Sequence, residues 1–91
     1  MINLYTAFDV QLELRDFISQ SRKRNKLSVE ELANCSGVPY STIRKFESTG
    51  NISLRQFLML YEVIGDLKQL RSLTQVDADQ PSSIEEVLRN A

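Results

Sequence analysis

Residues 27–47, LSVEELANCSGVPYSTIRKFE, hold two short helical patterns with only a brief break between them. Ser28, followed by Glu31 three residues later, forms the reciprocal capping pattern with which many helices begin. Gly37 is suited to ending that helix, because a tight turn needs a backbone conformation that most residues resist. Pro39 is favoured in the first turn of the next helix, where its missing N–H needs no partner. This segment therefore constrains the chain to a pair of tightly connected, steeply crossing helices.

The two helices have distinct inward and outward faces. A close crossing of two helices requires a small residue, and the positions expected to face inward are Leu32, Ala33, Val38, Ile43 and Phe46. The opposite face of the second helix carries Tyr40, Ser41, Arg44 and Lys45. Because this face is polar and partly basic, its chemistry suits the major groove of duplex DNA.

The rest of the chain also favours short helices. Apolar spacings of three and four residues predict a helix over residues 9–24, whose inner face holds Val10, Leu14, Phe17, Ile18 and Ser21. Asn25 is placed to end it in a left-handed conformation. Ser53 with Gln56 predicts a capping box for a helix that ends at Gly65. Further helices are expected over residues 66–73 and from residue 83, and residues 2–6 are a candidate edge strand. The predicted fold class is all-α.

Length and composition indicate one globular domain. The chain has 91 residues, of which 42% are hydrophobic and 25% charged. We expect the domain over residues 9–73, an N-terminal arm over residues 1–8, and a linker with a short C-terminal helix over residues 74–91. No apolar run approaches the length of a membrane helix, and residues 1–9 lack the features of a signal peptide. A cytoplasmic location is therefore expected.

The residue types that common catalytic sites need are scarce. The sequence has no histidine and one cysteine, Cys35, so an internal disulfide, an ordinary zinc site and a nucleophile–base pair all lack parts. It also has no glycine-rich phosphate loop. The sequence therefore predicts that the chain is not an enzyme and binds no metal and no cofactor.

Charge is unevenly distributed, although the net charge is only −1. Residues 15–55 carry eight basic and four acidic side chains, a local charge of +4, whereas the remainder has three basic and eight acidic ones, a charge of −5. Attraction of DNA phosphates needs a positive face rather than a positive total. A DNA-binding middle segment is therefore compatible with the overall negative charge.

These residues resemble the lambda-repressor-like helix-turn-helix family, also called the Xre or Cro/repressor type. The resemblance covers roughly residues 14–65. It rests on the small residue and glycine of the turn, the Ser41-Thr42-Ile43 opening, the Phe46-Glu47 pair and the Ile64-Gly65 helix end. It implies a five-helix, all-α DNA-binding domain, here followed by a short C-terminal helix.

The resemblance also implies roles for individual residues. The positions that match base-reading ones are Tyr40, Ser41 and Lys45, with Arg44 beside them in reach of a base or a phosphate. The positions that match phosphate-contacting ones are Ser28, Ser48, Asn51 and Arg55. Arg22 and Glu47 match a structural ion pair. Val29 stands where the family often has a supporting glutamine, and Pro39-Tyr40 replaces a small polar opening, so the family's base preference does not transfer.

Members of this family typically bind paired half-sites as a two-fold dimer. The apolar positions expected to form the homodimer interface are Met59, Leu60, Val63, Leu67 and Leu70. Residues 2–6 are a candidate strand that pairs across this interface. The segment after Gly65 is more loosely similar to the tails of HipB-type antitoxin regulators, which accompany HipA-type kinase toxins.

Together these features predict a sequence-specific, double-stranded DNA-binding autorepressor, as the HipB-like antitoxin of a toxin–antitoxin module. Its expected partners are a palindromic operator, a second copy of the chain and a HipA-type kinase toxin. A restriction–modification controller and a phage repressor are open variants of this prediction. The alternative is a protein-interaction module of the same fold that binds a partner protein without reading DNA. The net negative charge and Val29 favour that alternative, whereas Arg44, Lys45 and Arg55 count against it.

Overall fold

The computed structural model describes residues 4–75, and all regular secondary structure in that part is helical. The order is α1 (Ala7–Arg24), α2 (Val29–Ser36), α3 (Tyr40–Thr49), α4 (Leu54–Ile64), α5 (Leu67–Arg71) and the 3-10 turn η1 (Ser72–Thr74). The all-α prediction is confirmed for this part of the chain. The short helix predicted from residue 83 lies outside the described residues, as do residues 2 and 3 of the candidate strand; residues 4–6 form no strand.

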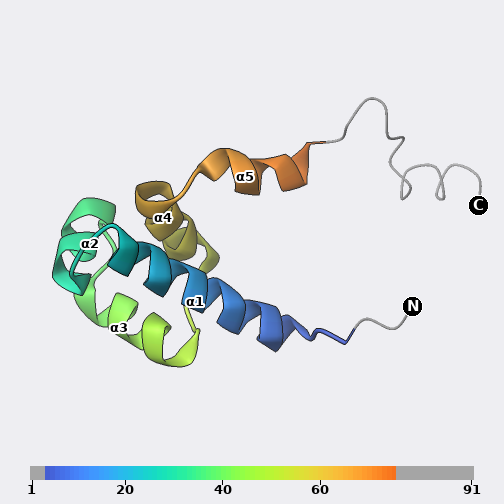
Figure 1. Ribbon diagram of the computed structural model, residues 1–91, viewed down its shortest axis with the longest axis horizontal. Coiled ribbons are helices and arrows are strands. Elements are labelled where there is room, and N and C mark those ends of the chain that lie inside the picture. Colours follow the sequence, from blue (N-terminus) through green and yellow to red (C-terminus); the bar gives the residue numbers. More distant parts are fainter. Residues whose placement is uncertain (1–3, 76–91) are drawn as a thin grey trace, which may run out of the picture.

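The helices form a small bundle with two extensions. α2 packs against α3 and α4, and α1 packs against the same two helices. Beyond this bundle, the N-terminal half of α1 and the α5–η1 segment extend in the same direction (Figure 1). None of the helices over residues 4–75 has the length and apolar character that a membrane crossing requires.

The first helix begins earlier than its sequence indicated. The prediction placed its start at Asp9, whereas the structure begins α1 at Ala7. Thr6 Oγ1 accepts a hydrogen bond from Asp9 N at 3.1 Å, and Asp9 Oδ2 accepts one from Thr6 N at 3.0 Å. Thr6 and Asp9 thus form a capping box in which aspartate replaces the usual glutamate or glutamine, which is why the pattern was missed.

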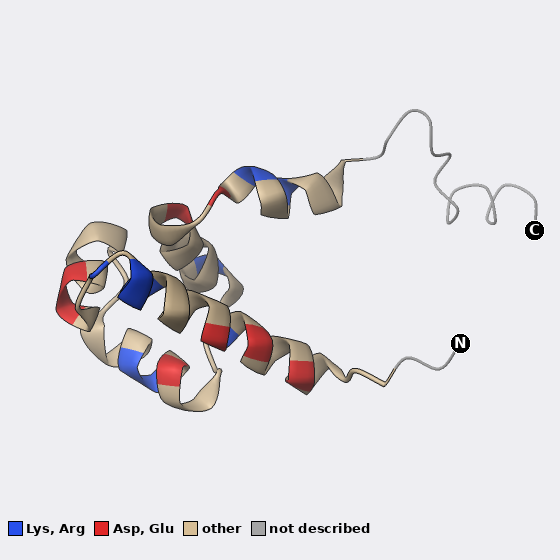
Figure 2. Cartoon of the chain, in the orientation of Figure 1, with Lys and Arg blue, Asp and Glu red and all other residues tan. Residues whose placement is uncertain are grey.

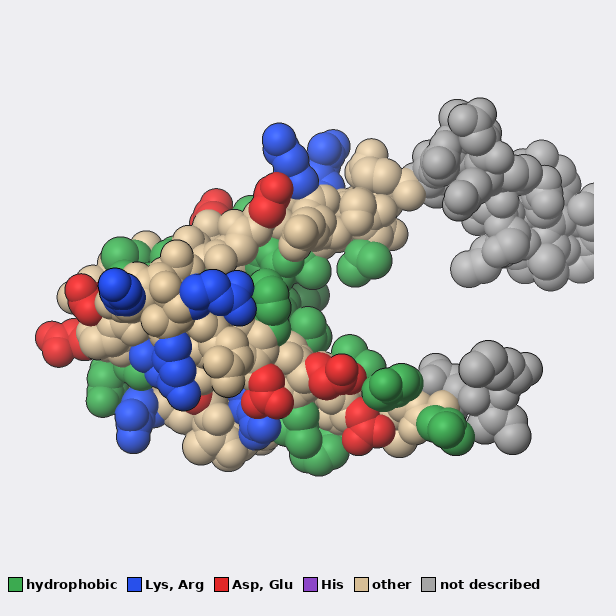
Figure 3. All heavy atoms as spheres, viewed as in Figure 1, with side chains coloured by type: hydrophobic (Ala, Val, Ile, Leu, Met, Phe, Trp, Pro, Cys, Tyr) green, Lys and Arg blue, Asp and Glu red, His purple; other side chains and the backbone are tan. Residues whose placement is uncertain are grey.

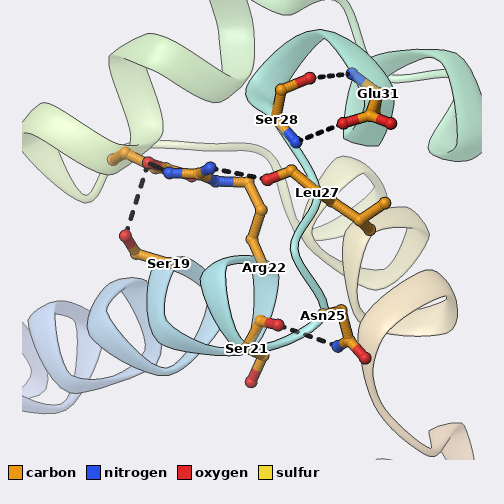
Figure 4. A network of polar contacts seen from close by, with 8 residues as sticks. Ser19, Ser21, Arg22, Asn25, Leu27, Ser28 and Glu31 are labelled. Atoms are coloured by element: carbon orange, nitrogen blue, oxygen red, sulfur yellow. Dashed lines mark hydrogen bonds and ion pairs between the residues drawn. The ribbon is translucent and has the colours of Figure 1, made fainter.

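The end of α1 also differs from the prediction. Asn25 stays in a right-handed conformation, with φ of −84°, because its Nδ2 donates to the carbonyl oxygen of Ser21 at 2.8 Å (Figure 4). The left-handed conformation falls instead on Lys26, with φ of +58°. A lysine in this conformation is strained, because its Cβ approaches the following carbonyl oxygen.

Both ends of α2 follow the prediction. Ser28 and Glu31 form the expected capping box, and Gly37 ends α2 with φ of +82°.

At the start of α4 the capping box is only half formed. Ser53 Oγ accepts a hydrogen bond from Gln56 N, but the Gln56 side chain contacts the Ser53 hydroxyl instead of the Ser53 backbone. The capping box predicted for Ser53 and Gln56 is therefore wrong in its second half.

The core lies where α1 to α4 meet. Its largest fully buried side chains are Ile18, Leu32, Val38, Ile43, Phe46 and Leu60. Phe46 of α3 meets Phe57 of α4 edge to face, with ring centroids 6.2 Å apart. Such packing fixes the orientation of α3 relative to the rest of the bundle.

Two predicted apolar faces need correction. On α1 only Ile18 and Ser21 are buried, whereas Val10, Leu14 and Phe17 are exposed, because they line an open hollow on one side of the helix. Leu60, predicted to lie in a dimer interface, is 0% exposed and belongs to the core of the single chain. A side chain without accessible surface cannot contact a second copy, so Leu60 is removed from that interface.

Candidate nucleic-acid interface

The outer side of α3 carries all four side chains that were predicted to read bases. Tyr40, Ser41, Arg44 and Lys45 are exposed, Tyr40 by 51%. Helix positions four apart are neighbours, so Tyr40 lies beside Arg44 and Ser41 beside Lys45. On the other side of the helix, Ile43 and Phe46 are fully buried. We refer to the four exposed residues as the α3 ridge.

The α3 ridge keeps its positive charge. Neither Arg44 nor Lys45 forms an ion pair with an acidic side chain of residues 4–75. On α1 the acidic side chains are those of Asp9, Glu13 and Asp16, Arg15 is paired with Asp16, and the other basic side chains lie together in the last turn (Figure 2). Charge is therefore segregated in space as well as along the sequence, which leaves a local positive field that attracts polyanions.

An ion pair between Arg22 of α1 and Glu47 of α3 holds α3 against α1. Arg22 Nε lies 2.8 Å from Glu47 Oε2, and Arg22 donates a second hydrogen bond to Glu47 Oε1 at 3.0 Å. Its remaining terminal nitrogen donates to the carbonyl oxygen of Leu27 at 2.9 Å (Figure 4). The predicted pair is thus present, and it connects α1, α3 and the loop before α2.

Ser28 has fewer free donors than its predicted role required. Its backbone N–H donates to Glu31 Oε1 at 2.8 Å, and its Oγ accepts from Glu31 N at 3.0 Å (Figure 4). Since the amide is occupied, the hydroxyl hydrogen is the one donor that Ser28 could offer a phosphate, and the Glu31 carboxylate competes for it. The backbone hydrogen bond from Ser28, followed by the side-chain one, holds the pKa of Glu31 below its ordinary value of 4.5. Glu31 is therefore charged at neutral pH and opposes an anion at this helix end.

The turn between α3 and α4 carries the other predicted phosphate contacts. Ser48 Oγ donates to the carbonyl oxygen of Lys45 at 3.1 Å, so its hydroxyl hydrogen is already used. Asn51 and Arg55 are exposed, and Arg55 forms no ion pair with residues 4–75. Of the four candidates, Asn51 and Arg55 are the best placed to donate outward.

Gln11 contacts this turn from α1 and was missed by sequence reasoning. Its Nε2 donates to the carbonyl oxygen of Gly50 at 2.6 Å. The two residues are 39 positions apart, so no local pattern in the sequence announces the contact.

An apolar groove lies apart from the α3 ridge, between the N-terminal half of α1 and the α4–α5–η1 side. A hollow of about 630 Å³ is lined by Leu14, Leu58, Leu70 and Leu73, among others, and a second hollow shares Leu14 and Leu70 with it. Hydrophobic side chains line the open space between the two extensions (Figure 3). Of the predicted dimer residues, Met59, Val63 and Leu70 are partly buried against the core and Leu67 is exposed.

Comparison of the chain with protein-family models, with curated proteins and with solved structures finds no match. Assignment of a function therefore depends on the residues and their geometry.

Proposed function

We propose that this chain is a sequence-specific, double-stranded DNA-binding transcriptional regulator with a lambda-repressor-like helix-turn-helix domain. The observation that carries the proposal is the α3 ridge: four exposed side chains, two of them unpaired cations, on a short helix whose other side is buried. A helix presented in this way fits the major groove, where Arg44 and Lys45 are suited to guanine acceptors and Tyr40 to a thymine methyl group. Since DNA is the ligand, the proposed location is the cytoplasm.

Contacts with the DNA sugar–phosphate backbone would set the position of α3 in the groove. Asn51 and Arg55 follow α3 directly and are exposed, so they can donate to phosphates that flank the bases contacted by the ridge. The Ser28 hydroxyl supplies a weaker contact, because the charge of Glu31 lies beside it. The Arg22–Glu47 pair keeps α3 in register with these groups.

The proposal is tested with a binding site selected from random duplex DNA. The native chain should prefer this site over mixed-sequence DNA and should bind less tightly as salt rises, by a slope of about −0.9 for each neutralised phosphate. Lys45→Ala should cost about 1–3 kcal/mol of that preference if the side chain reads a base. Lys68→Ala, on α5, is the matched control and should leave the preference unchanged. Absence of duplex binding at low salt would contradict the proposal.

We further propose that the chain acts as a homodimer on a palindromic operator. The apolar groove supports this, because exposed apolar side chains of α1, α4 and η1 gather there: Leu14, Phe17, Leu58 and Leu73. Leu67, which is exposed, and Leu70, which lines the groove, stay in the proposed interface. Met59 and Val63 pack against the core, and Met59 Cε lies beside Gly37, so these two residues are not part of the groove surface that we propose. Sedimentation should show Leu73→Asp as a monomer and Tyr40→Asp, outside the groove, as a dimer. A Leu73→Asp chain that stays dimeric would contradict this interface.

The finer assignment, a HipB-like antitoxin that represses its own operon and binds a HipA-type kinase toxin, stays a proposal that rests on the sequence after Gly65. Most of that segment lies outside the described residues. If the assignment is right, a neighbouring reading frame encodes a kinase whose expression stops growth, and co-expression of this chain restores it. Failure to restore growth would leave the DNA-binding proposal intact and remove the antitoxin role.

A protein-interaction module without DNA recognition is the second candidate, and the apolar groove is the observation that favours it. The two candidate functions differ in which substitution should weaken ligand binding: Lys45→Ala for a DNA-binding protein, and Leu73→Asp for an interaction module. Loss of partner binding in Leu73→Asp, together with no effect of Lys45→Ala on any ligand, would favour the interaction module.

A further inference from the structure

Gln11 connects the N-terminal half of α1 to the turn that carries Asn51. Its Nε2 donates to the carbonyl oxygen of Gly50 at 2.6 Å and to Asn51 Oδ1 at 3.2 Å. The Gln11 side chain is half-buried, and its contact with Gly50 is partly buried. Both acceptors are oxygens, so the amide nitrogen of Gln11 is the end that must face the turn.

Gly50 makes this close approach possible. It is buried and has φ of +82°, and a Cβ built on it would lie 3.1 Å from Leu12 Cδ2 and 3.6 Å from Gln11 Nε2. The backbone of the turn therefore sits directly against α1, with no side chain between them. The carbonyl oxygen of Gly50 anchors Gln11, and Gln11 in turn reaches the next residue along the chain.

The contact determines how the Asn51 amide is oriented. Because Asn51 Oδ1 accepts from Gln11, the nitrogen of the same amide is directed away from α1. Asn51 is exposed, and its Nδ2 donates no hydrogen bond to residues 4–75. The backbone of Asn51 is held as well, since its N–H donates to Thr49 Oγ1 at 3.1 Å.

We propose that Gln11 is a positioning residue for DNA binding, which holds the Asn51 amide so that it presents two N–H donors to a phosphate. The inference rests on the proposed function. An amide without this contact can turn over, and its oxygen would then face the phosphate and repel it. Orientation by Gln11 removes that state, so the fraction of chains with a correctly turned amide rises from about one half to nearly one, and binding should strengthen about twofold.

The test is a double-mutant cycle in Gln11→Met and Asn51→Ala, with a labelled mixed-sequence duplex at low salt as the probe. Methionine keeps the length of the side chain and removes its donors without changing charge. Gln11→Met should weaken duplex binding about twofold in the native background and should have no effect in the Asn51→Ala background. Gln20→Met, an exposed position on the same helix, is the matched control and should leave binding unchanged.

A second readout follows Asn51 itself. In the native chain the side-chain NH₂ signals of Asn51 should shift when the duplex is added, and Gln11→Met should reduce that shift. Equal losses in both backgrounds would overturn the inference, because Gln11 would then act on the fold as a whole. If the native chain binds the duplex and Gln11→Met binds it equally well, the positioning role of Gln11 is overturned and the proposed function stands. Absence of binding by the native chain would overturn the proposed function with it.

Discussion

Removal of Arg22 should destabilise this domain more than removal of any other basic side chain of residues 4–75. Arg22→Met leaves Glu47, whose side chain is only 16% exposed, without its two hydrogen bonds from the guanidinium group. Ser19 Oγ, 3.5 Å from Glu47 Oε1, is a weak substitute, and the carbonyl oxygen of Leu27 also loses its donor. Breaking a buried pair on one side costs about 3–5 kcal/mol. Because both side chains keep some solvent access, we expect about 3 kcal/mol.

Urea denaturation measures this loss. For a domain of this size the slope of unfolding free energy against urea is about 1–1.5 kcal/mol per molar, so the midpoint should fall by about 2 M or more. The thermal midpoint should fall by roughly 12–24 °C. The matched control is Arg15→Met, which breaks the pair of Arg15 with its neighbour Asp16, whose side chains are 24% and 62% exposed. Such an open pair contributes about 1 kcal/mol or less.

A double variant separates the ion pair from simple loss of packing. Arg22→Met combined with Glu47→Met removes both charges, so it should be less destabilised than the sum of the two single variants by about 1–3 kcal/mol. The reasoning would be refuted by additive losses, or by a loss at Arg22 no larger than that at Arg15.

Other predictions concern the helix ends and turns. Ser28→Ala should lower stability by about 1 kcal/mol at neutral pH and raise the pKa of Glu31 toward 4.5, which an NMR titration would follow. The lowered pKa of Glu31 stabilises the fold at pH values above the pKa of the unfolded chain, and this contribution is lost as pH falls through the pKa of the folded chain. The difference in unfolding free energy between the native and Ser28→Ala chains should therefore narrow below pH 4.5. A difference that stays constant with pH would contradict this. In chemical denaturation, Gly37→Ala should lower the unfolding free energy by about 1 kcal/mol and Gly50→Ala by about 2 kcal/mol. Both glycines have φ of +82°, but of the two only Gly50 would place a new Cβ as close as 3.1 Å to a neighbouring side chain. Lys26→Gly should gain about 1 kcal/mol by relieving the left-handed lysine, and an unchanged midpoint would argue against strain at that residue.

Local signals were readable from the sequence because the groups that produce them lie within one helical turn. Ser28 and Glu31 cap α2, Gly37 ends it, and Ile43 with Phe46 faces inward, as three- and four-residue spacings predicted. Even the missed start of α1 was local, since Thr6 and Asp9 differ from the common capping pattern only in the acidic residue. The separation of the α3 ridge from the buried face of its helix therefore follows from periodicity alone.

Tertiary structure decided which apolar side chains are covered. Leu58 and Leu60 are both leucines on α4, yet Leu60 is fully buried and Leu58 is exposed beside the groove. Periodicity places Leu58 and Leu60 on different faces of α4, because they are two positions apart, but only the packing of the other helices decides which of the two faces is covered. Phe17 of α1 stacks on Tyr61 of α4, with ring centroids 5.5 Å apart, and is still 37% exposed because its other side faces the groove.

Contacts between segments that are distant in the sequence could not be predicted from residue patterns either. The Arg22–Glu47 pair could be predicted only through a family resemblance, and Gln11 with Gly50 not at all. Such contacts depend on where the chain returns after several turns and helices, and small errors in each angle accumulate along the path. The sequence by itself determined that the chain forms helices and which side of α3 is buried. The packing of α1 against the α3–α4 turn determined which polar groups meet, because only the folded chain brings those atoms within hydrogen-bonding distance.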